Sequence, residues 1–235
     1  MAQPAHARTS STRGNGQAPT STTRTKNIVV IGATRHTGRY AMQQALDAGY
    51  AVTALARDRT RVDLTHERLT VVQGDVLDPA TLAPAMASAE AVISTIGVTN
   101  RAPTTLYSEG MRNIITAMRD TGVRRLVAVT ASPLSIDDGD TLLTRLLIKP
   151  LLLALLKPVY ADMAMMEEEI RQSGLDWTIL RPPRLTDKPA TGRYRLAFNR
   201  SVRRGNVISR ADLAGAILTL LNDPRALHAA IGIGY

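Results

Sequence analysis

The sequence contains no cysteine, which excludes disulfide bonds and thiolate ligands to a metal. Its four histidines lie far apart, and no two have the spacing of ligands on one helix face, so no metal site is expected. Aromatic residues make up only 3% of the chain, too few for base stacking, and no nucleic-acid-binding motif is present. No apolar run is long enough to cross a bilayer. We therefore expect a small-molecule ligand, without a nucleic-acid or membrane partner.

Acidic residues are scarce in one part of the chain. The net charge is +9, and between Arg181 and Arg210 nine Arg or Lys residues face the single acid Asp187. An electropositive mouth for a phosphate-bearing ligand or an anionic substrate would explain this cluster. A nucleic-acid surface and a solvated face of an arginine-rich protein are the alternatives. We favour the mouth, because nucleic-acid motifs are missing.

The first 25 residues lack acids and apolar periodicity. They are rich in Ser, Thr, Gly and Pro, which predicts a disordered basic tail over residues 1–25. An organellar transit peptide is the alternative, whereas the lack of an apolar segment argues against a secretory signal. We expect a cytoplasmic protein whose residues 26–235 form one domain.

The segment Lys26–Arg39 carries the clearest pattern. Asn27–Ile31 is a short β-branched run typical of a buried strand, and helical spacing begins at Thr37. Gly32 and Gly38 bracket the turn between them. A strand that enters a helix through such a turn offers backbone N–H groups to a phosphate, as at the start of a dinucleotide-binding fold.

Further apolar runs alternate with helical segments, and no hairpin signal separates them. The strands are expected at Ala51–Ala56, Leu69–Gln73, Ala91–Thr95, Arg125–Thr130 and Trp177–Leu180. This alternation predicts an α/β, Rossmann-type, doubly wound parallel sheet, in which ligands bind beyond the carboxyl ends of the strands. Arg57 ends the second strand and favours NADP, since an arginine there accommodates a 2′-phosphate, although Asp58 beside it would suit NAD.

Beyond Ser135 the alternation stops, and residues from about 133 to 205 are expected to form a small substrate-binding extension. Leu142–Leu156 is rich in leucine but interrupted by charges and Pro150. It could be a lid over a substrate pocket, a subunit interface or a buried helix, and a leucine stripe favours the buried helix. Tyr160–Gln172 is expected to be helical, Asn206–Ile208 to be a last strand, and Ser209 with Asp212 to cap a helix that ends before Pro224.

Several motifs together resemble the atypical short-chain dehydrogenase/reductase proteins, in particular the NmrA-like NAD(P)H-binding proteins and the biliverdin reductase B (flavin reductase) type. The matching segments are Gly32-Ala33-Thr34, Thr37-Gly38, Ala56-Arg57-Asp58, Gly74-Asp75-Val76, Ser108–Ile114 and Ser173–Pro182. The resemblance implies NADP(H) as cofactor. It implies the cofactor-binding residues Gly32, Thr34, Arg35, His36, Thr37, Gly38, Arg57, Asp75, Val76, Thr95, Ile96, Gly97, Thr130 and Pro182. Within this set, Thr34–Gly38 would meet the phosphates and Asp75-Val76 the adenine.

Two departures from the family pattern bear on chemistry. Arg35 stands where the family has a middle glycine, so the turn is reshaped or binds more weakly, unless the arginine itself reaches a phosphate. The family's Tyr-x-x-x-Lys pair is also missing, because Tyr160 is followed at the third and fourth positions by Met163 and Ala164. Alcohol oxidation through such a pair is therefore not expected.

Three functions are compatible with these features. The first, which we favour, is an NADPH-dependent reductase of a flavin, quinone or polyketide-like acceptor in secondary metabolism, with Ser132 or Tyr160 as the catalytic hydrogen-bond or proton donor. The second is a non-redox isomerase, cyclase or lyase that uses His36, Tyr160, Asp162 or Glu167 as acid or base. The third is an NADP-sensing regulatory protein. A monomer or a homodimer is expected in each case.

Overall fold

A computed structural model describes residues 26–34, 36–98, 102, 104–134, 141–155 and 157–235. Its main sheet has eight strands in the order β3-β2-β1-β4-β5-β6-β10-β8. They are β1 (Asn27–Ile31), β2 (Ala51–Ala56), β3 (Leu69–Gln73), β4 (Ala91–Ser94), β5 (Arg125–Val129), β6 (Asp176–Arg181), β8 (Arg195–Phe198) and β10 (Ala229–Gly234). The six strands expected from the apolar runs are all present, and the Rossmann-type fold is confirmed. The strand order reverses beside β1, which pairs with β2 on one side and with β4 on the other.

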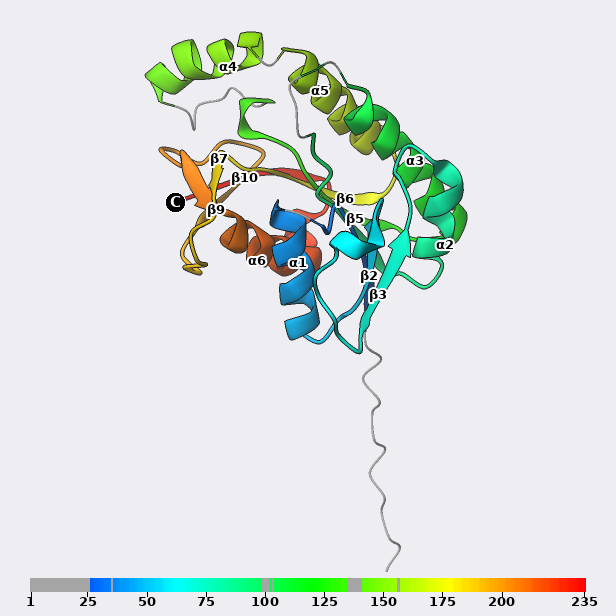
Figure 1. The fold of residues 1–235 in the computed structure, drawn as a ribbon. Helices are drawn as coiled ribbons and strands as arrows, with labels where there is room; N and C mark the ends of the chain where they lie inside the picture. Colours follow the sequence, from blue (N-terminus) through cyan, green and yellow to red (C-terminus); the bar gives the residue numbers. More distant parts are fainter. Residues whose placement is uncertain (1–25, 35, 99–101, 103, 135–140, 156) are drawn as a thin grey trace, which may run out of the picture.

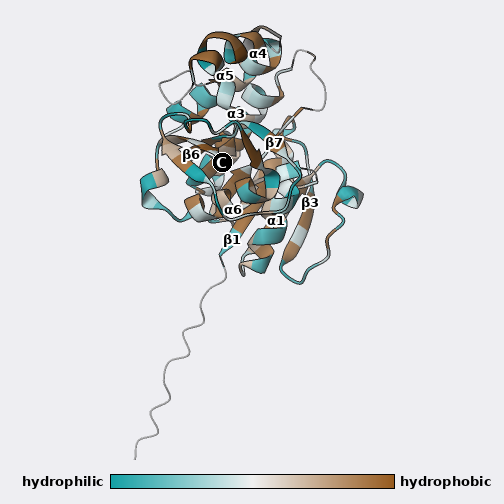
Figure 2. Cartoon of the chain, turned by 90° about the vertical axis from the view of Figure 1, so that its left-hand side faces the viewer, coloured by the Kyte–Doolittle hydropathy of each residue, from teal (hydrophilic) through white to brown (hydrophobic). Residues whose placement is uncertain are grey.

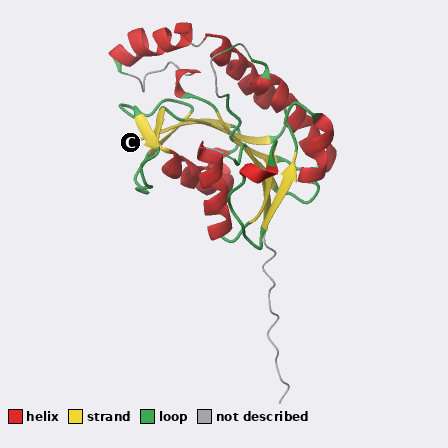
Figure 3. Cartoon of the chain, in the orientation of Figure 1, coloured by secondary structure: helices red, strands yellow, loops and turns green. Residues whose placement is uncertain are grey.

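Alternation along the central strands divides the core into two layers. Ile28 and Val30 of β1 pack in one layer and Val29 and Ile31 in the other, as the two-residue period of a strand requires. The first layer is covered by α1 (His36–Asp47) and α6 (Arg210–Leu221), and the second by α2 (Leu82–Met86), α3 (Leu106–Thr121) and α5 (Lys157–Gln172). Figures 1 and 3 show these helices on opposite faces of the sheet.

Capping residues fix the ends of two helices. Gly122 closes α3 in the left-handed conformation, with φ of +75°. The Ser209 side chain accepts a hydrogen bond from the Asp212 backbone N–H and caps α6, which confirms the predicted cap. Asp212 is itself buried, and it accepts hydrogen bonds from the backbone N–H groups of Thr191 and Gly192 and from the Tyr235 hydroxyl. This carboxylate therefore joins α6 to the preceding loop and to the C-terminal residue.

The sheet is not wholly parallel, which corrects the expectation from the sequence. β8 pairs antiparallel with β10, and both strands were missed. In β10 the glycines Gly232 and Gly234 interrupt the apolar run, and a Cβ at Gly232 would lie only 2.4 Å from the carbonyl oxygen of Arg200. Glycine here permits close approach of the loop after β8, so the strand reads as a turn in the sequence. The strand predicted at 206–208 is β9 (Val207–Ser209), which pairs with β7 (Arg184–Thr186) in a separate two-stranded sheet.

The leucine-rich segment is helical, but the leucines whose side chains the structure describes are exposed, which corrects the favoured interpretation of a buried helix. It comprises a π-helical turn, η4 (Thr144–Ile148), followed by α4 (Lys149–Leu155), while residue 156 lies outside the described residues. Leu142, Leu146 and Leu151 are 76%, 71% and 62% exposed. Figure 2 shows the hydrophobic residues along α4 at the edge of the molecule. Among the residues that the structure describes, no helix is long and apolar enough to span a membrane.

Candidate cofactor and substrate sites

Two cavities lie along the carboxyl ends of the parallel strands. The first, called the cofactor cavity here, encloses about 310 Å³ above β1, β2, β3 and β4. It is lined by Ile31, Gly32, Thr34, His36, Leu55, Ala56, Arg57, Arg61, Gly74, Asp75, Val76, Thr95, Ile96, Gly97, Val98 and Leu106. It therefore lies at the topological switch point, where the strand order reverses and where such folds bind ligands.

The turn between β1 and α1 needs its two glycines for steric reasons. Gly32 has φ of +84°, and a Cβ there would lie 2.7 Å from the carbonyl oxygen of Thr95. A Cβ at Gly38 would lie 2.2 Å from the carbonyl oxygen of Gly32. Both glycines let the start of α1 pack against the end of β4, where the Thr95 hydroxyl donates to the carbonyl oxygen of Ile31 at 2.9 Å. The N-terminus of α1, which favours anions, thus faces the cofactor cavity.

His36 begins α1 with an unusual backbone. Its φ is +53°, a left-handed conformation that is costly for a residue with a Cβ, and the side chain is exposed at the cavity. Arg35, the residue that replaces the family's middle glycine, lies outside the described residues. The reshaping expected from Arg35 therefore stays a prediction.

Two arginines line the cofactor cavity beyond β2. Arg57 follows the strand, and Arg61 lies on the 3₁₀ turn η1 (Arg59–Arg61). Asp58 caps this turn, because its carboxylate accepts hydrogen bonds from the backbone N–H of Thr60 at 3.0 Å and the Thr60 hydroxyl at 2.6 Å. Arg61 was missed in the sequence, although the Asp58-x-Thr60 spacing of a capped turn could have indicated it.

The third strand delivers an acid and an apolar side chain to the same cavity. Asp75 accepts a hydrogen bond from the Leu77 backbone N–H at 3.0 Å. Val76 is buried, and its carbonyl oxygen accepts from the Asn113 side-chain amide at 2.9 Å. Gly110 of α3 allows this contact, since a Cβ there would lie 2.9 Å from a Val76 methyl group. The cavity wall at β3 is therefore fixed by α3.

The second cavity, called the substrate cavity here, encloses about 530 Å³ beyond β5, β6 and β10. It is lined by Ala131, Ser132, Pro133, Thr141, Thr144, Ile148, Lys149, Tyr160, Arg181, Pro182, Pro183, Arg184, Ser201, Val202, Arg204, Gly205, Asn206 and Ile233. The Ser132 backbone N–H donates to the carbonyl oxygen of Pro182 at 2.8 Å, which holds the segment after β5 against the segment after β6. Part of the leucine-rich segment also forms this wall, through Thr144, Ile148 and Lys149.

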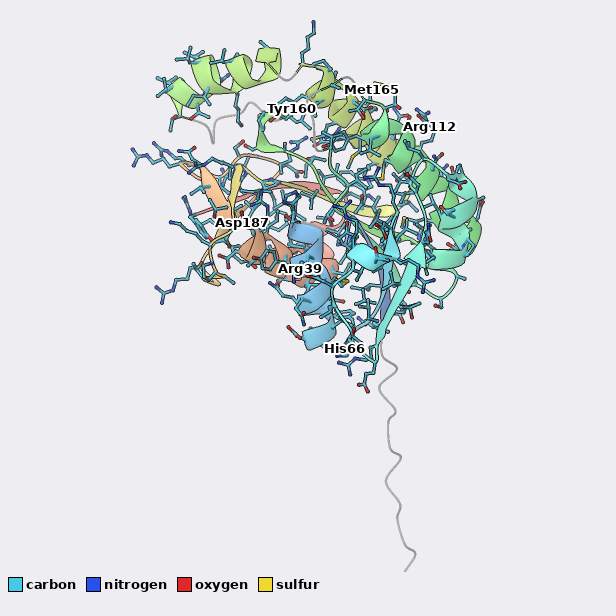
Figure 4. The ribbon with its side chains drawn as sticks, viewed as in Figure 1. Arg39, His66, Arg112, Tyr160, Met165 and Asp187 are labelled. Carbon is cyan, nitrogen blue, oxygen red and sulfur yellow. The ribbon has the colours of Figure 1, made fainter. Side chains whose placement is uncertain are left out.

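Tyr160 faces the substrate cavity from the first turns of α5 (Figure 4). Burial raises the pKa of its hydroxyl, and the neighbouring Tyr107 raises it further. Tyr160 is thus a neutral phenol at physiological pH, able to donate a hydrogen bond or a proton.

The two buried carboxylates beside Tyr160 on α5 make structural contacts. Glu167 accepts hydrogen bonds from Thr130 at 2.8 Å, Arg181 at 2.5 Å and Arg171 at 2.6 Å. Burial alone would raise the pKa of Glu167, but the hydrogen bonds and charge of Arg181, helped by Thr130 and Arg171, outweigh it and lower that pKa. Asp162 accepts from the backbone N–H groups of Tyr107 and Ser108 at the start of α3. Neither carboxylate is placed as a free acid or base.

The structure separates the predicted site residues into three groups. Those on the cofactor cavity are Gly32, Thr34, His36, Arg57, Asp75, Val76, Thr95, Ile96 and Gly97. Those on the substrate cavity are Ser132, Tyr160 and Pro182. Thr37, Gly38 and Thr130 contribute to neither lining; Thr37 and Thr130 are buried, and Gly38 packs against Gly32. Within the described ranges, no cluster of His, Asp or Glu side chains could hold a metal ion.

The donor set of the cofactor cavity fits a dinucleotide. A helix N-terminus and two guanidinium groups are available to phosphates, and Leu55, Val76, Ile96 and Leu106 offer an apolar surface to a base. A strand–turn–helix unit at the switch point of a doubly wound sheet, with this cavity above it, defines a dinucleotide-binding Rossmann domain. The family model of NAD(P)H-binding proteins matches residues 32–224, and the chain therefore belongs to this NAD(P)H-binding family.

Known proteins are similar to this chain in sequence or in structure. It is 33% identical over 106 residues to the photosystem II assembly factor Ycf39 of Synechocystis, an alignment that covers 43% of this chain and 32% of Ycf39. It is 30% identical over 178 residues to an uncharacterized chloroplastic protein of Arabidopsis thaliana, covering 72% of this chain and 62% of that protein. The chain thus spans less than two thirds of either relative. A short-chain dehydrogenase/reductase from Veillonella parvula, solved in complex with NADP, is 23% identical, with a TM-score of 0.74 over 89% of this chain and 94% of the other.

Proposed function

We propose that the protein is an NADPH-dependent reductase of a conjugated small molecule such as a flavin, a quinone or a polyketide-like aromatic compound. The observation that carries this proposal is the pair of cavities above neighbouring strands, one with donors for a dinucleotide and one largely apolar. Because β4 and β5 pair directly, the two cavities open along one edge of the sheet. The structure from Veillonella parvula, described as a complex with NADP, supports the same class.

The arginines favour NADPH over NADH. Arg57 and Arg61 would hold the 2′-phosphate through charge-assisted hydrogen bonds. Asp58 caps η1 through its Oδ1 and does not line the cofactor cavity, so we assign it no contact with a ribose 2′-hydroxyl such as an NAD-specific acid would make. Asp75 and Val76 would lie beside the adenine, and the α1 N-terminus with Thr34 would bind the phosphates.

Bound NADPH supplies a hydride, and the side chains of the substrate cavity orient the acceptor and complete its protonation. A neutral Tyr160 can donate a hydrogen bond to an acceptor oxygen, and the Ser132 hydroxyl is the second donor on the same cavity. No Tyr-x-x-x-Lys pair is needed for this role, because the phenol acts as an acid rather than as a base. The apolar part of the lining, which includes Ile148, Val202 and Ile233, would pack against the reacting ring.

Steady-state oxidation of NADPH tests the proposal. We expect the purified protein to oxidise NADPH with menadione or riboflavin as acceptor, and Tyr160→Phe to lower kcat by about 10² if the phenol donates the proton. If Ser132→Ala lowers kcat more than Tyr160→Phe does, the serine hydroxyl is the proton donor instead. NADPH binding without turnover of any conjugated acceptor would favour the NADP-sensing protein instead, and failure to bind NADPH would favour the non-redox enzyme.

A further inference from the structure

The charged residues that line the substrate cavity are all basic. Lys149, Arg181, Arg184 and Arg204 belong to it, whereas none of its lining residues, all in the described part of the chain, is an aspartate or a glutamate. These four residues come from α4, from the end of β6, from the start of β7 and from the loop before β9. Segments that are distant in the sequence therefore bring positive charge to one apolar cavity.

Two of these cations have structural roles. Arg181 donates to both oxygens of Glu167, which offsets its charge. Lys149 is 3% exposed, and its ammonium group donates to the Ser201 hydroxyl at 3.1 Å. These contacts account for Arg181 and Lys149 in the cavity wall without a ligand.

Arg184 and Arg204 differ from the other two. Both are exposed, and no ion pair or side-chain hydrogen bond joins either of them to another residue that the structure describes. Asp187, the acid closest to Arg184 in sequence, pairs instead with Arg210 at 2.7 Å. Figure 4 shows Asp187 beside β7 and β9. Asp212, the acid closest to Arg204, is buried and accepts hydrogen bonds from Thr191, Gly192 and Tyr235. Two guanidinium groups at the opening of the cavity are thus available to a ligand.

The backbone at Arg204 supports a ligand-binding role. Its φ is +58°, in the left-handed region that favours glycine or asparagine over arginine. The next residue is Gly205, where a Cβ would lie 2.8 Å from Val202, so the turn is tightly packed. An arginine held in a strained turn at the rim of a cavity is the kind of outlier that marks a functional position.

We propose that the substrate cavity selects acceptors that carry an anionic group, a phosphate or a carboxylate, which Arg184 and Arg204 bind at the opening. This inference rests on the proposed reductase function and names its substrate class. The conjugated ring would lie on Ile148, Pro182, Val202 and Ile233, and the anion would accept hydrogen bonds from the two guanidinium groups. A volume of about 530 Å³ suits a ring system of two or three fused rings.

FMN and riboflavin form a matched pair for the test, since they share one ring system and differ by a phosphate. We expect kcat/KM with NADPH to be at least about tenfold higher for FMN, and Arg204→Gly or Arg184→Gln to lower the FMN-to-riboflavin ratio by about tenfold each. A menadione analogue with a carboxylate side chain, compared with menadione, distinguishes a carboxylate site from a phosphate site. Arg204→Gly relieves the left-handed strain and should fold, and Arg204→Asn is a second variant that tolerates this backbone.

Arg203→Gln is the matched control. It removes the same charge one position earlier, and Arg203 does not line the cavity. We expect this variant to keep the parent's FMN-to-riboflavin ratio. Equal kcat/KM values for the two flavins in the parent, or equal effects of the Arg203 and Arg204 substitutions, would overturn the proposal.

Flavin binding separates this proposal from the reductase function. Quenching of flavin fluorescence by the NADP-loaded protein measures affinity without turnover. If no acceptor is reduced but FMN binds at least about tenfold more tightly than riboflavin in an Arg204-dependent way, the anion site stands and the reductase function fails. If both flavins are reduced and bound equally well, the reductase function stands and the anion site is refuted.

Discussion

The preference for NADPH can be tested at the two arginines beyond β2. Arg57 and Arg61 line the same cavity, and both are exposed. A hydrogen bond between charged partners contributes about 1.5–3 kcal/mol. Arg57→Ala should therefore weaken NADPH binding by roughly 10- to 150-fold and leave NADH binding nearly unchanged.

We expect a smaller effect from Arg61→Ala, because Arg61 lies on the short turn η1, whereas Arg57 directly follows strand β2. The Asp58 carboxylate maintains η1, and removal of such a cap costs about 1 kcal/mol. Asp58→Ala should accordingly weaken NADPH binding through Arg61, although it removes a negative charge from the edge of the site. An increase in NADPH affinity would show instead that Asp58 acts on the phosphate by repulsion.

Isothermal titration of the parent, the single variants and the Arg57/Arg61 double variant with NADPH and NADH measures all of these effects. The double variant reveals whether the arginines bind the phosphate jointly, since residues that share a partner are not additive. Higher salt should reduce the difference between the cofactors, because exposed charges are screened. Equal affinities of the parent for NADPH and NADH would refute the reasoning.

Three further predictions concern the tail, the turn and acid stability. Deletion of residues 1–25, which lie outside the described residues, should leave the melting temperature and NADPH affinity unchanged, and a fall of several degrees would show that the tail packs on the domain. Arg35→Gly should change NADPH affinity by less than about tenfold if the arginine contacts the phosphates. If the parent shows no detectable NADPH binding and the variant binds NADPH well, a non-redox enzyme is favoured. Burial would raise the pKa of Asp212, but hydrogen bonds from Tyr235, Thr191 and Gly192 lower it to about 2. The ionised carboxylate therefore stabilises the fold above the ordinary pKa of 3.8, and this stabilisation is lost as the pH falls toward 2. Asp212→Asn should reduce the free energy of unfolding at neutral pH by about 2 kcal/mol and make it depend less on pH in the acid range. Urea titrations at several pH values measure this, and parallel pH profiles of parent and variant would contradict it.

Local patterns were sufficient for the first half of the fold. Asn27–Ile31 and Ala51–Ala56 are uninterrupted apolar runs, and the strands have these bounds. The C-terminal half depends on contacts that the local sequence does not reveal. β10 contains two glycines because a loop packs on it, and Leu146, Leu147 and Leu151 are exposed although the leucine spacing suggested burial. Arg61 joins the candidate site only because η1 brings it to the wall of the cofactor cavity, which no strand or helix period indicates.

The two cavities draw on separate parts of the chain. Every residue that lines the cofactor cavity lies at or before Leu106, and every residue that lines the substrate cavity lies at or after Ala131. Substitutions in one half can therefore alter ligand choice without touching the other half's contacts. In evolution, such a division lets new substrate specificities arise by drift after residue 130 while dinucleotide binding is retained. For engineering, it predicts that chimaeras joined within α3, between the two sets of lining residues, exchange substrates and keep their coenzyme.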